Sequence, residues 1–154
     1  MTSSGDFGER HRASTSVDID AEPDRVWHAL VDPDLVARYL HGTALDTDWA
    51  VGGPIVWRGE WEGKPYEDKG EVREFDPPRR LAITHWSPLT GAPDTPENQN
   101  HVTYDLEPID DGRTRVTLTH GNSPSQEAAE AMIENGWQPV LQALKQVVEA
   151  DDKP

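Results

Sequence analysis

Residues 125–150 read SQEAAEAMIENGWQPVLQALKQVVEA and carry a sustained apolar stripe. The apolar residues recur at the three- and four-residue spacing of a helix with one apolar face. This spacing predicts a long C-terminal helix that packs along a sheet. Gly136 and Pro139 lie inside the stripe, and a proline there removes a hydrogen bond and clashes one turn back. We therefore predict a kink near Asn135, which would leave space between the helix and the sheet.

The chain before this helix is dominated by short segments with the alternation of β-strands. Turn signals such as Gly52-Gly53-Pro54 and Asp110-Asp111-Gly112 separate them, and short connections imply an antiparallel meander. Two short helices, starting at Pro23 and Pro33, follow the first strand. The predicted strands are residues 12–20, 45–49, 55–61, 69–75, 80–86, 101–107 and 113–120.

This order of elements predicts an α+β protein with the helix-grip fold, in which a curved antiparallel sheet of about seven strands wraps around one long C-terminal helix. Residues 12–150 are expected to form a single domain. Residues 1–11 and 151–154 are polar and nonperiodic, so we expect them to be disordered. The segment from Ser87 to Asn100 is rich in proline and is interpreted as a surface loop or a lid.

Composition narrows the classes of function. The chain has 14 Lys and Arg against 29 Asp and Glu, a net charge of -15 that disfavours nucleic acid and anionic membranes as partners. Because there is no cysteine, no long apolar run and no apolar signal segment, we expect a cytoplasmic protein. We also expect a monomer or a homodimer. No phosphate loop or dinucleotide fingerprint occurs, and no metal-ligand spacing, so we expect neither a cofactor nor a metal.

A series of motifs resembles one superfamily along residues 13–149. The motifs are VDIDAEPDRVW at 17–27, DWAVGGP at 48–54, GEVREFDPPRRL at 70–81, VTYDLEP at 102–108, TRVTLTH at 114–120 and Gly136-Trp137. In this order they resemble the SRPBCC superfamily, which includes START domains and birch-pollen-allergen relatives. Within it, the chain is similar to the bacterial branch related to the activator of heat-shock-protein-90 ATPase.

The resemblance implies a range of functions. Members of the superfamily bind lipids, polyketides, hormones and other apolar molecules, and a minority catalyse cyclisation, dehydration or hydrolysis in the same cavity. The resemblance also implies a co-chaperone role like that of the eukaryotic relatives. In that role this domain contacts a partner protein, assisted by a second domain. The resemblance therefore implies the fold, and it leaves the activity open.

Alternation along the predicted strands assigns candidate pocket residues, because inward-facing side chains recur at every second position. A concave site with apolar walls and a few polar groups is typical of small-molecule binding. Within it, His85, His120 and Tyr104 are the candidates for acid–base or hydrogen-bonding roles. The predicted ligand-binding residues are Trp57, Trp61, Ile83, His85, Tyr104, Leu118, His120, Met132, Ile133 and Trp137.

Three functions fit these observations. The first is a binding module that holds an apolar or aromatic molecule between the sheet and the C-terminal helix. The second is a cyclase- or hydrolase-type enzyme that uses the same pocket, which a close pair of His85 and His120 would favour. The third is a co-chaperone-like domain that binds a protein partner and whose pocket is incidental, which a filled cavity and an exposed apolar patch would favour.

Overall fold

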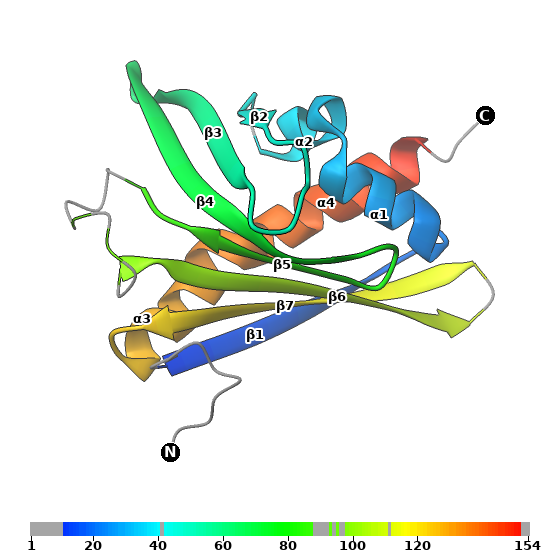
Figure 1. Cartoon of the computed structure of the whole chain (residues 1–154). Coiled ribbons are helices and arrows are strands. Elements are labelled where there is room, and N and C mark those ends of the chain that lie inside the picture. Colours follow the sequence, from blue (N-terminus) through cyan, green and yellow to red (C-terminus); the bar gives the residue numbers. More distant parts are fainter. Residues whose placement is uncertain are drawn as a thin grey trace.

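The computed structural model is a curved, seven-stranded antiparallel sheet wrapped around a C-terminal helix (Figure 1). It describes residues 11–40, 42–87, 93, 95, 98–110 and 112–151. The predicted helix-grip architecture is confirmed, including two short helices after the first strand. The disorder predicted for both ends falls almost wholly on residues 1–10 and 152–154, which lie outside the described residues. Most of the predicted loop or lid also lies outside them.

The strands follow the sheet order β1-β7-β6-β5-β4-β3-β2, and each pairs with its neighbours in antiparallel register. Two helices, α1 and α2, connect β1 to β2, and the helices α3, η4 and α4 follow one another at the C-terminal end. The bounds are β1 His11–Ile19, α1 Pro23–Val31, α2 Pro33–Tyr39, β2 Ala44–Asp46, β3 Pro54–Trp61, β4 Lys64–Asp76, β5 Arg80–His85, β6 Asn100–Asp110, β7 Arg113–Ser123, α3 Gln126–Met132, η4 Ile133–Trp137 and α4 Gln138–Asp151.

Strands β6 and β7 each end three residues later than predicted, and two other strands differ more. The segment predicted at 45–49 contributes only the three-residue β2, because Trp49 has a positive φ of 60° and leaves the extended conformation. In contrast, β4 starts at Lys64, five residues earlier than predicted. The turn needs only Glu62 and Gly63, both with positive φ, so the following residues pair with β3. This longer strand adds inward-facing positions before residue 69.

The C-terminal helix contains a π-helical segment where the sequence predicts a kink. Ser125 caps the start of α3 by accepting a hydrogen bond from the Ala128 N–H at 3.0 Å. In η4 the pattern widens, and the Gln138 N–H donates to the Ile133 carbonyl five residues back. Pro139 has no N–H to donate and would clash with a carbonyl four residues back, which accounts for the wider turn at this place. The irregularity lies against the sheet at the predicted position.

The core lies between the concave face of the sheet and the C-terminal helix. Its fully buried side chains come from both layers and include Ile55, Val72 and Leu118 from the sheet and Leu141 and Leu144 from α4. Burying side chains of this size stabilises a domain by about 1.5–3 kcal/mol each. The apolar faces of the strands and of the C-terminal helix therefore pack into one shared core.

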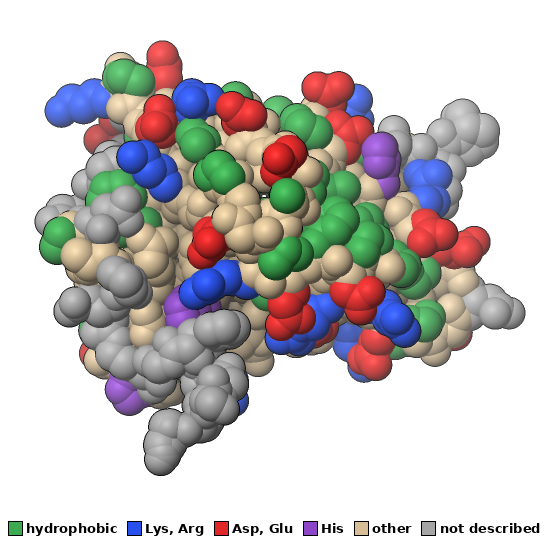
Figure 2. Space-filling model, viewed as in Figure 1, with side chains coloured by type: hydrophobic (Ala, Val, Ile, Leu, Met, Phe, Trp, Pro, Cys, Tyr) green, Lys and Arg blue, Asp and Glu red, His purple; other side chains and the backbone are tan. Residues whose placement is uncertain are grey.

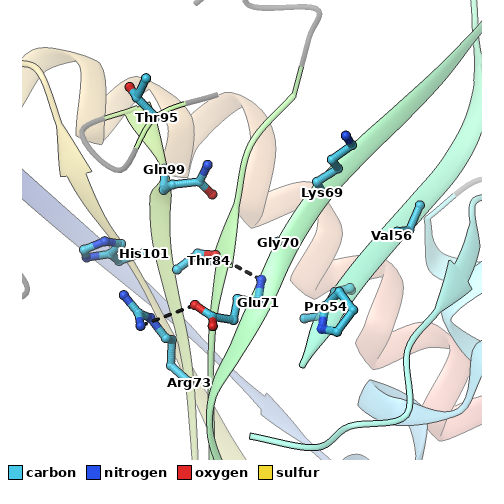
Figure 3. A pocket seen from close by; sticks show the side chains of 11 residues that line it. Pro54, Val56, Lys69, Gly70, Glu71, Arg73, Thr84, Thr95, Gln99 and His101 are labelled. Atoms are coloured by element: carbon cyan, nitrogen blue, oxygen red, sulfur yellow. Dashed lines mark hydrogen bonds and ion pairs between the residues drawn. The ribbon is translucent and has the colours of Figure 1, made fainter. Parts of the chain in front are cut away.

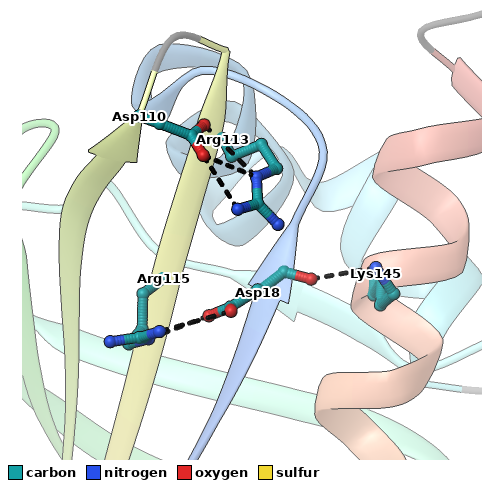
Figure 4. Close-up of polar contacts among 5 residues, drawn as sticks. All are labelled: Asp18, Asp110, Arg113, Arg115 and Lys145. Atoms are coloured by element: carbon teal, nitrogen blue, oxygen red, sulfur yellow. Dashed lines mark hydrogen bonds and ion pairs between the residues drawn. The ribbon is translucent and has the colours of Figure 1, made fainter.

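Polar contacts fix the helix to the outer strand of the sheet (Figure 4). The Lys145 ammonium group on α4 donates to the Asp18 carbonyl on β1 at 2.9 Å and also pairs with Glu149. The Asp18 carboxylate in turn accepts a hydrogen bond from Arg115 on β7 at 2.9 Å, and this bond lowers the pKa of Asp18. No helix among the described residues is long and apolar enough to cross a membrane.

Candidate functional site

A cavity of about 240 Å³ lies between the sheet and the C-terminal helix. Strands β3 to β6 form one wall, α1, α2 and the segment after them form another, and η4 and α4 close the third side. Most of the lining is apolar or aromatic, which is the usual character of a small-molecule site. The lining residues are Leu30, Val36, Tyr39, Leu40, Thr43, Leu45, Trp49, Trp57, Tyr66, Asp68, Leu81, Ile83, His85, Tyr104, Met132, Gly136, Trp137 and Val140.

Two glycines let large aromatic side chains lie close to the sheet at this cavity. A Cβ atom on Gly59 would lie 2.7 Å from the Tyr66 hydroxyl, and one on Gly70 would lie 3.1 Å from the Trp57 ring. The same Cβ atom on Gly70 would lie only 2.0 Å from the Thr84 carbonyl oxygen, which belongs to the backbone of β5. Glycine is therefore required at residue 70 by the close approach of strand and ring.

One end of the cavity is polar, and its main feature is a pair formed by Asp68 and His85. The His85 Nε2 lies 2.9 Å from the Asp68 Oδ2, and the side chains are only 25% and 14% exposed. On the other side of the ring, the Asn100 amide nitrogen lies 3.4 Å from His85 Nδ1. An amide nitrogen can only donate, so Nδ1 accepts and Nε2 carries the proton that is donated to Asp68. The geometry therefore holds the imidazole between an amide and a carboxylate.

Asp68 has a second oxygen that is not satisfied by this pair. Its Oδ1 is buried and has no hydrogen-bond partner among the described residues. Leaving a buried acceptor unpaired is unfavourable by about 1–3 kcal/mol, and more for a charged group. Asp68 is therefore a polar lining residue with unused hydrogen-bonding capacity.

Aromatic and hydroxyl groups surround this polar end. Trp57 packs against His85 in a T-shaped arrangement, with ring centroids 5.1 Å apart. The Tyr66 hydroxyl and the Thr43 hydroxyl lie 3.0 Å apart within hydrogen-bonding reach. Burial raises the pKa of both Tyr39 and Tyr104 well above the usual value, so these phenols stay uncharged. The cavity thus combines neutral aromatic groups with one carboxylate–imidazole pair.

His120 is buried behind the cavity lining, at 1% exposure. Its Nδ1 accepts a hydrogen bond of 2.9 Å from the Trp137 indole N–H, which links β7 to η4. Burial lowers the pKa of His120 to about 4, with smaller contributions from His85 and His101. A neutral His120 is therefore part of the packing between the sheet and the helix.

The structure brings six of the ten predicted pocket residues to the cavity wall, and these are Trp57, Ile83, His85, Tyr104, Met132 and Trp137. Three others, Leu118, His120 and Ile133, are buried in the core and are not in the lining. They face inward as alternation predicts, but neighbouring side chains cover them. The side chain of Trp61 lies outside the described part of the structure. His85 and His120 bond to different partners, Asp68 and Trp137.

Two residues of the polar end, Tyr66 and Asp68, are absent from the sequence prediction. They lie on β4 ahead of its predicted start, on the same face as Gly70 and the buried Val72. Extending the alternation of Val72 and Gly70 backwards by four residues would have placed both of them inward. Tyr66 and Asp68 were therefore not predicted because β4 begins earlier than the sequence prediction placed it.

A second hollow, of about 470 Å³, lies on the opposite face of the sheet (Figure 3). Its side chains alternate with those of the cavity along β4 and β5, and most are polar or charged, such as Lys69 and Thr84. Glu71 and Arg73 form an ion pair of 3.3 Å there. No group of three or more metal-ligating side chains occurs in the described part of the chain.

Solved structures resemble this chain over nearly its whole length. A protein from Cytophaga hutchinsonii, solved in solution, is 38% identical, with a TM-score of 0.79 over 93% of this chain and 97% of that chain. An Hsp90 activator from Plasmodium falciparum is 19% identical, with a TM-score of 0.71 over 91% of this chain and 97% of that one. CalU16 from Micromonospora echinospora is 23% identical, with a TM-score of 0.70 over 94% and 84%.

At these lower identities the likeness of the last two structures establishes the fold alone. No curated protein matches the chain. The sequence profile of the family described as "Activator of Hsp90 ATPase homolog 1-like protein" matches residues 20–149. This range includes every element from α1 to η4 and nearly all of α4. The chain therefore belongs to the Activator of Hsp90 ATPase homolog 1-like family.

Proposed function

We propose that this protein is a small-molecule-binding domain whose cavity takes an aromatic or otherwise apolar ligand. The observation that carries the proposal is the cavity of about 240 Å³ between the sheet and η4–α4. Ligand pockets commonly span about 300–1,000 Å³, so this volume suits a compact molecule of one or two rings. The aromatic side chains around it would supply most of the contact area.

The π-helical segment supports this function. Met132, the last residue of α3 at 42% exposure, and Gly136 in η4 both line the cavity. A regular, tightly packed helix would close against the sheet, whereas a wider turn with a glycine leaves room. π-Helical turns are often found at functional sites, in agreement with a ligand position beneath η4.

The experiment is binding of a neutral fluorescent probe, N-phenyl-1-naphthylamine, to the folded protein. We expect micromolar affinity, about -8 kcal/mol. Val140→Trp adds a large ring on the α4 side of the cavity and should weaken binding about tenfold or more. The matched control is Val56→Trp, which places the same ring in the hollow on the other face of the sheet.

If the probe binds in the cavity, Val140→Trp should weaken its binding and Val56→Trp should not. Equal affinity of Val140→Trp and the unaltered protein would contradict a site in the cavity. Loss of binding only in Val56→Trp would move the site to the outer hollow. Both variants should first be compared in thermal unfolding, because overpacking costs about 1–3 kcal/mol.

A co-chaperone-like role is the second candidate, favoured by the family to which the chain belongs. Figure 2 shows hydrophobic side chains gathered on one face, over the region of α1, between groups of acidic and basic residues. Val51, which is 65% exposed, is an apolar residue available to a partner. Measurement of Hsp90 ATPase rates with and without the protein tests this role. An unchanged rate would count against it and leave the ligand-binding proposal intact.

A further inference from the structure

The charged groups of the cavity define what kind of ligand it can take, provided that the proposed ligand binding is correct. Among the described residues of the lining, Asp68 is the one carboxylate, and neither lysine nor arginine is present. His85, which also lines the cavity, lies 2.9 Å from the Asp68 carboxylate through its Nε2 and 3.4 Å from the Asn100 amide nitrogen through its Nδ1. The described lining therefore holds one carboxylate and no lysine or arginine to pair with it.

The carboxylate also has room for another hydrogen-bond donor. His85 occupies Oδ2, while Oδ1 is buried and has no partner among the described residues. The terminal torsion of an aspartate is soft, so a small rotation can turn either oxygen toward a donor in the cavity. A protonated amine, with several N–H groups and a positive charge, supplies both the missing hydrogen bond and the missing charge.

Six aromatic residues in the lining suit the same kind of ligand. They are Tyr39, Trp49, Trp57, Tyr66, Tyr104 and Trp137. Trp57 is the direct cross-strand partner of Asp68, and Tyr66 lies two residues before it on the same face of β4. Aromatic rings attract organic cations through their quadrupoles and also pack against a ligand's own rings. The aromatic groups therefore begin immediately beside the carboxylate.

We propose that the cavity binds a protonated aromatic amine of one or two rings, with its ammonium group on Asp68 and its rings among the aromatic side chains. A carboxylic acid of the same shape would place a second negative charge beside Asp68, which is unfavourable in a poorly hydrated site. A neutral alcohol keeps one hydrogen bond and loses the charge–charge attraction. The net charge of -15 also favours the approach of a cation.

Isothermal titration calorimetry with three compounds of matched shape tests this inference. The compounds are 2-(2-naphthyl)ethylamine, 2-(2-naphthyl)ethanol and 2-naphthylacetic acid. We expect the unaltered protein to bind the amine about tenfold or more tighter than the alcohol, and the acid most weakly. Asp68→Asn should remove the preference for the amine while its affinity for the alcohol changes less than about threefold.

Glu67→Gln is the matched control, because it removes the same charge from the neighbouring, exposed position of β4. The control should keep the preference for the amine. If Glu67→Gln and Asp68→Asn lose the preference equally, attraction to the acidic surface explains it and the inference is overturned. Equal binding of amine and alcohol by the unaltered protein, or tightest binding of the acid, overturns it too, while leaving the proposed ligand binding in place. If none of the three compounds and no neutral probe binds, the proposed function fails and the inference fails with it.

Discussion

Replacing His120 by phenylalanine is expected to make the protein less sensitive to mild acid. His120 is buried at 1% exposure and accepts a hydrogen bond from Trp137, so folding holds the imidazole in its neutral form. Its pKa is lowered to about 4, mainly by burial. In the unfolded chain the same group titrates near its ordinary value of about 6.5. Between these two values the unfolded state binds more protons than the folded state.

The size of the effect follows from these two pKa values. Stability rises with pH wherever the unfolded state binds more protons, so the contribution of His120 is fully favourable above about pH 6.5 and is lost as the pH falls toward about 4. Integrated down to about pH 4.5, the shift removes roughly 2.5 kcal/mol of the free energy of unfolding. A phenylalanine cannot take up a proton, so this loss disappears in the variant.

Urea unfolding followed by fluorescence, at steps from about pH 7.5 to about pH 4.5, measures the difference. The lost Trp137 hydrogen bond should lower the stability of the variant by a similar amount at every pH. The informative quantity is therefore the slope of the free energy of unfolding against pH. Val116→Ala, a destabilised control on the same strand without a titratable group, should run parallel to the unaltered protein. Parallel curves for all three proteins would refute the account of a buried, neutral His120.

Two further changes test the packing of the site. Trp137→Ala removes a ring that lines the cavity and contacts Tyr104 and His120. We expect the substitution to lower the free energy of unfolding by about 3 kcal/mol in urea titrations. An unchanged urea midpoint would mean that the ring is not packed. Gly70→Ala would place a Cβ atom 2.0 Å from a backbone oxygen of β5, so it should lower the thermal midpoint by several degrees, whereas Gly63→Ala, where nothing lies within 4 Å, reports only the strain of its positive φ.

The fold was predictable because the chain repeats its patterns clearly. The alternation in β1, β5, β6 and β7 and the apolar stripe from Ser125 onward all involve long runs of consistent spacing. The irregular helix at Asn135 was also predictable in place, because Pro139 lacks an N–H whatever surrounds it. That the chain would form a π-helical turn, rather than a sharp bend, depends on packing against the sheet.

The site was predictable only in part, because alternation reports the face of a strand but not the depth of a side chain. Leu118 and His120 are buried in the core, yet neither lines the cavity. Asp68 was not predicted because the strand was expected to begin only at residue 69. Its pairing with His85 depends on the register of β4 and β5, which the sequence does not specify.

The position of a bound ligand is the most direct test of a binding site between the sheet and the C-terminal helix. Methyl NMR of the protein titrated with 2-(2-naphthyl)ethylamine reports it, because the ring current of the ligand shifts nearby methyl signals. We predict large shifts for Ile83, Leu81 and Val140, which line the cavity, and none for Val56 in the outer hollow. Shifts at Val56 with unchanged Ile83 and Val140 signals would contradict a ligand site beneath the helix.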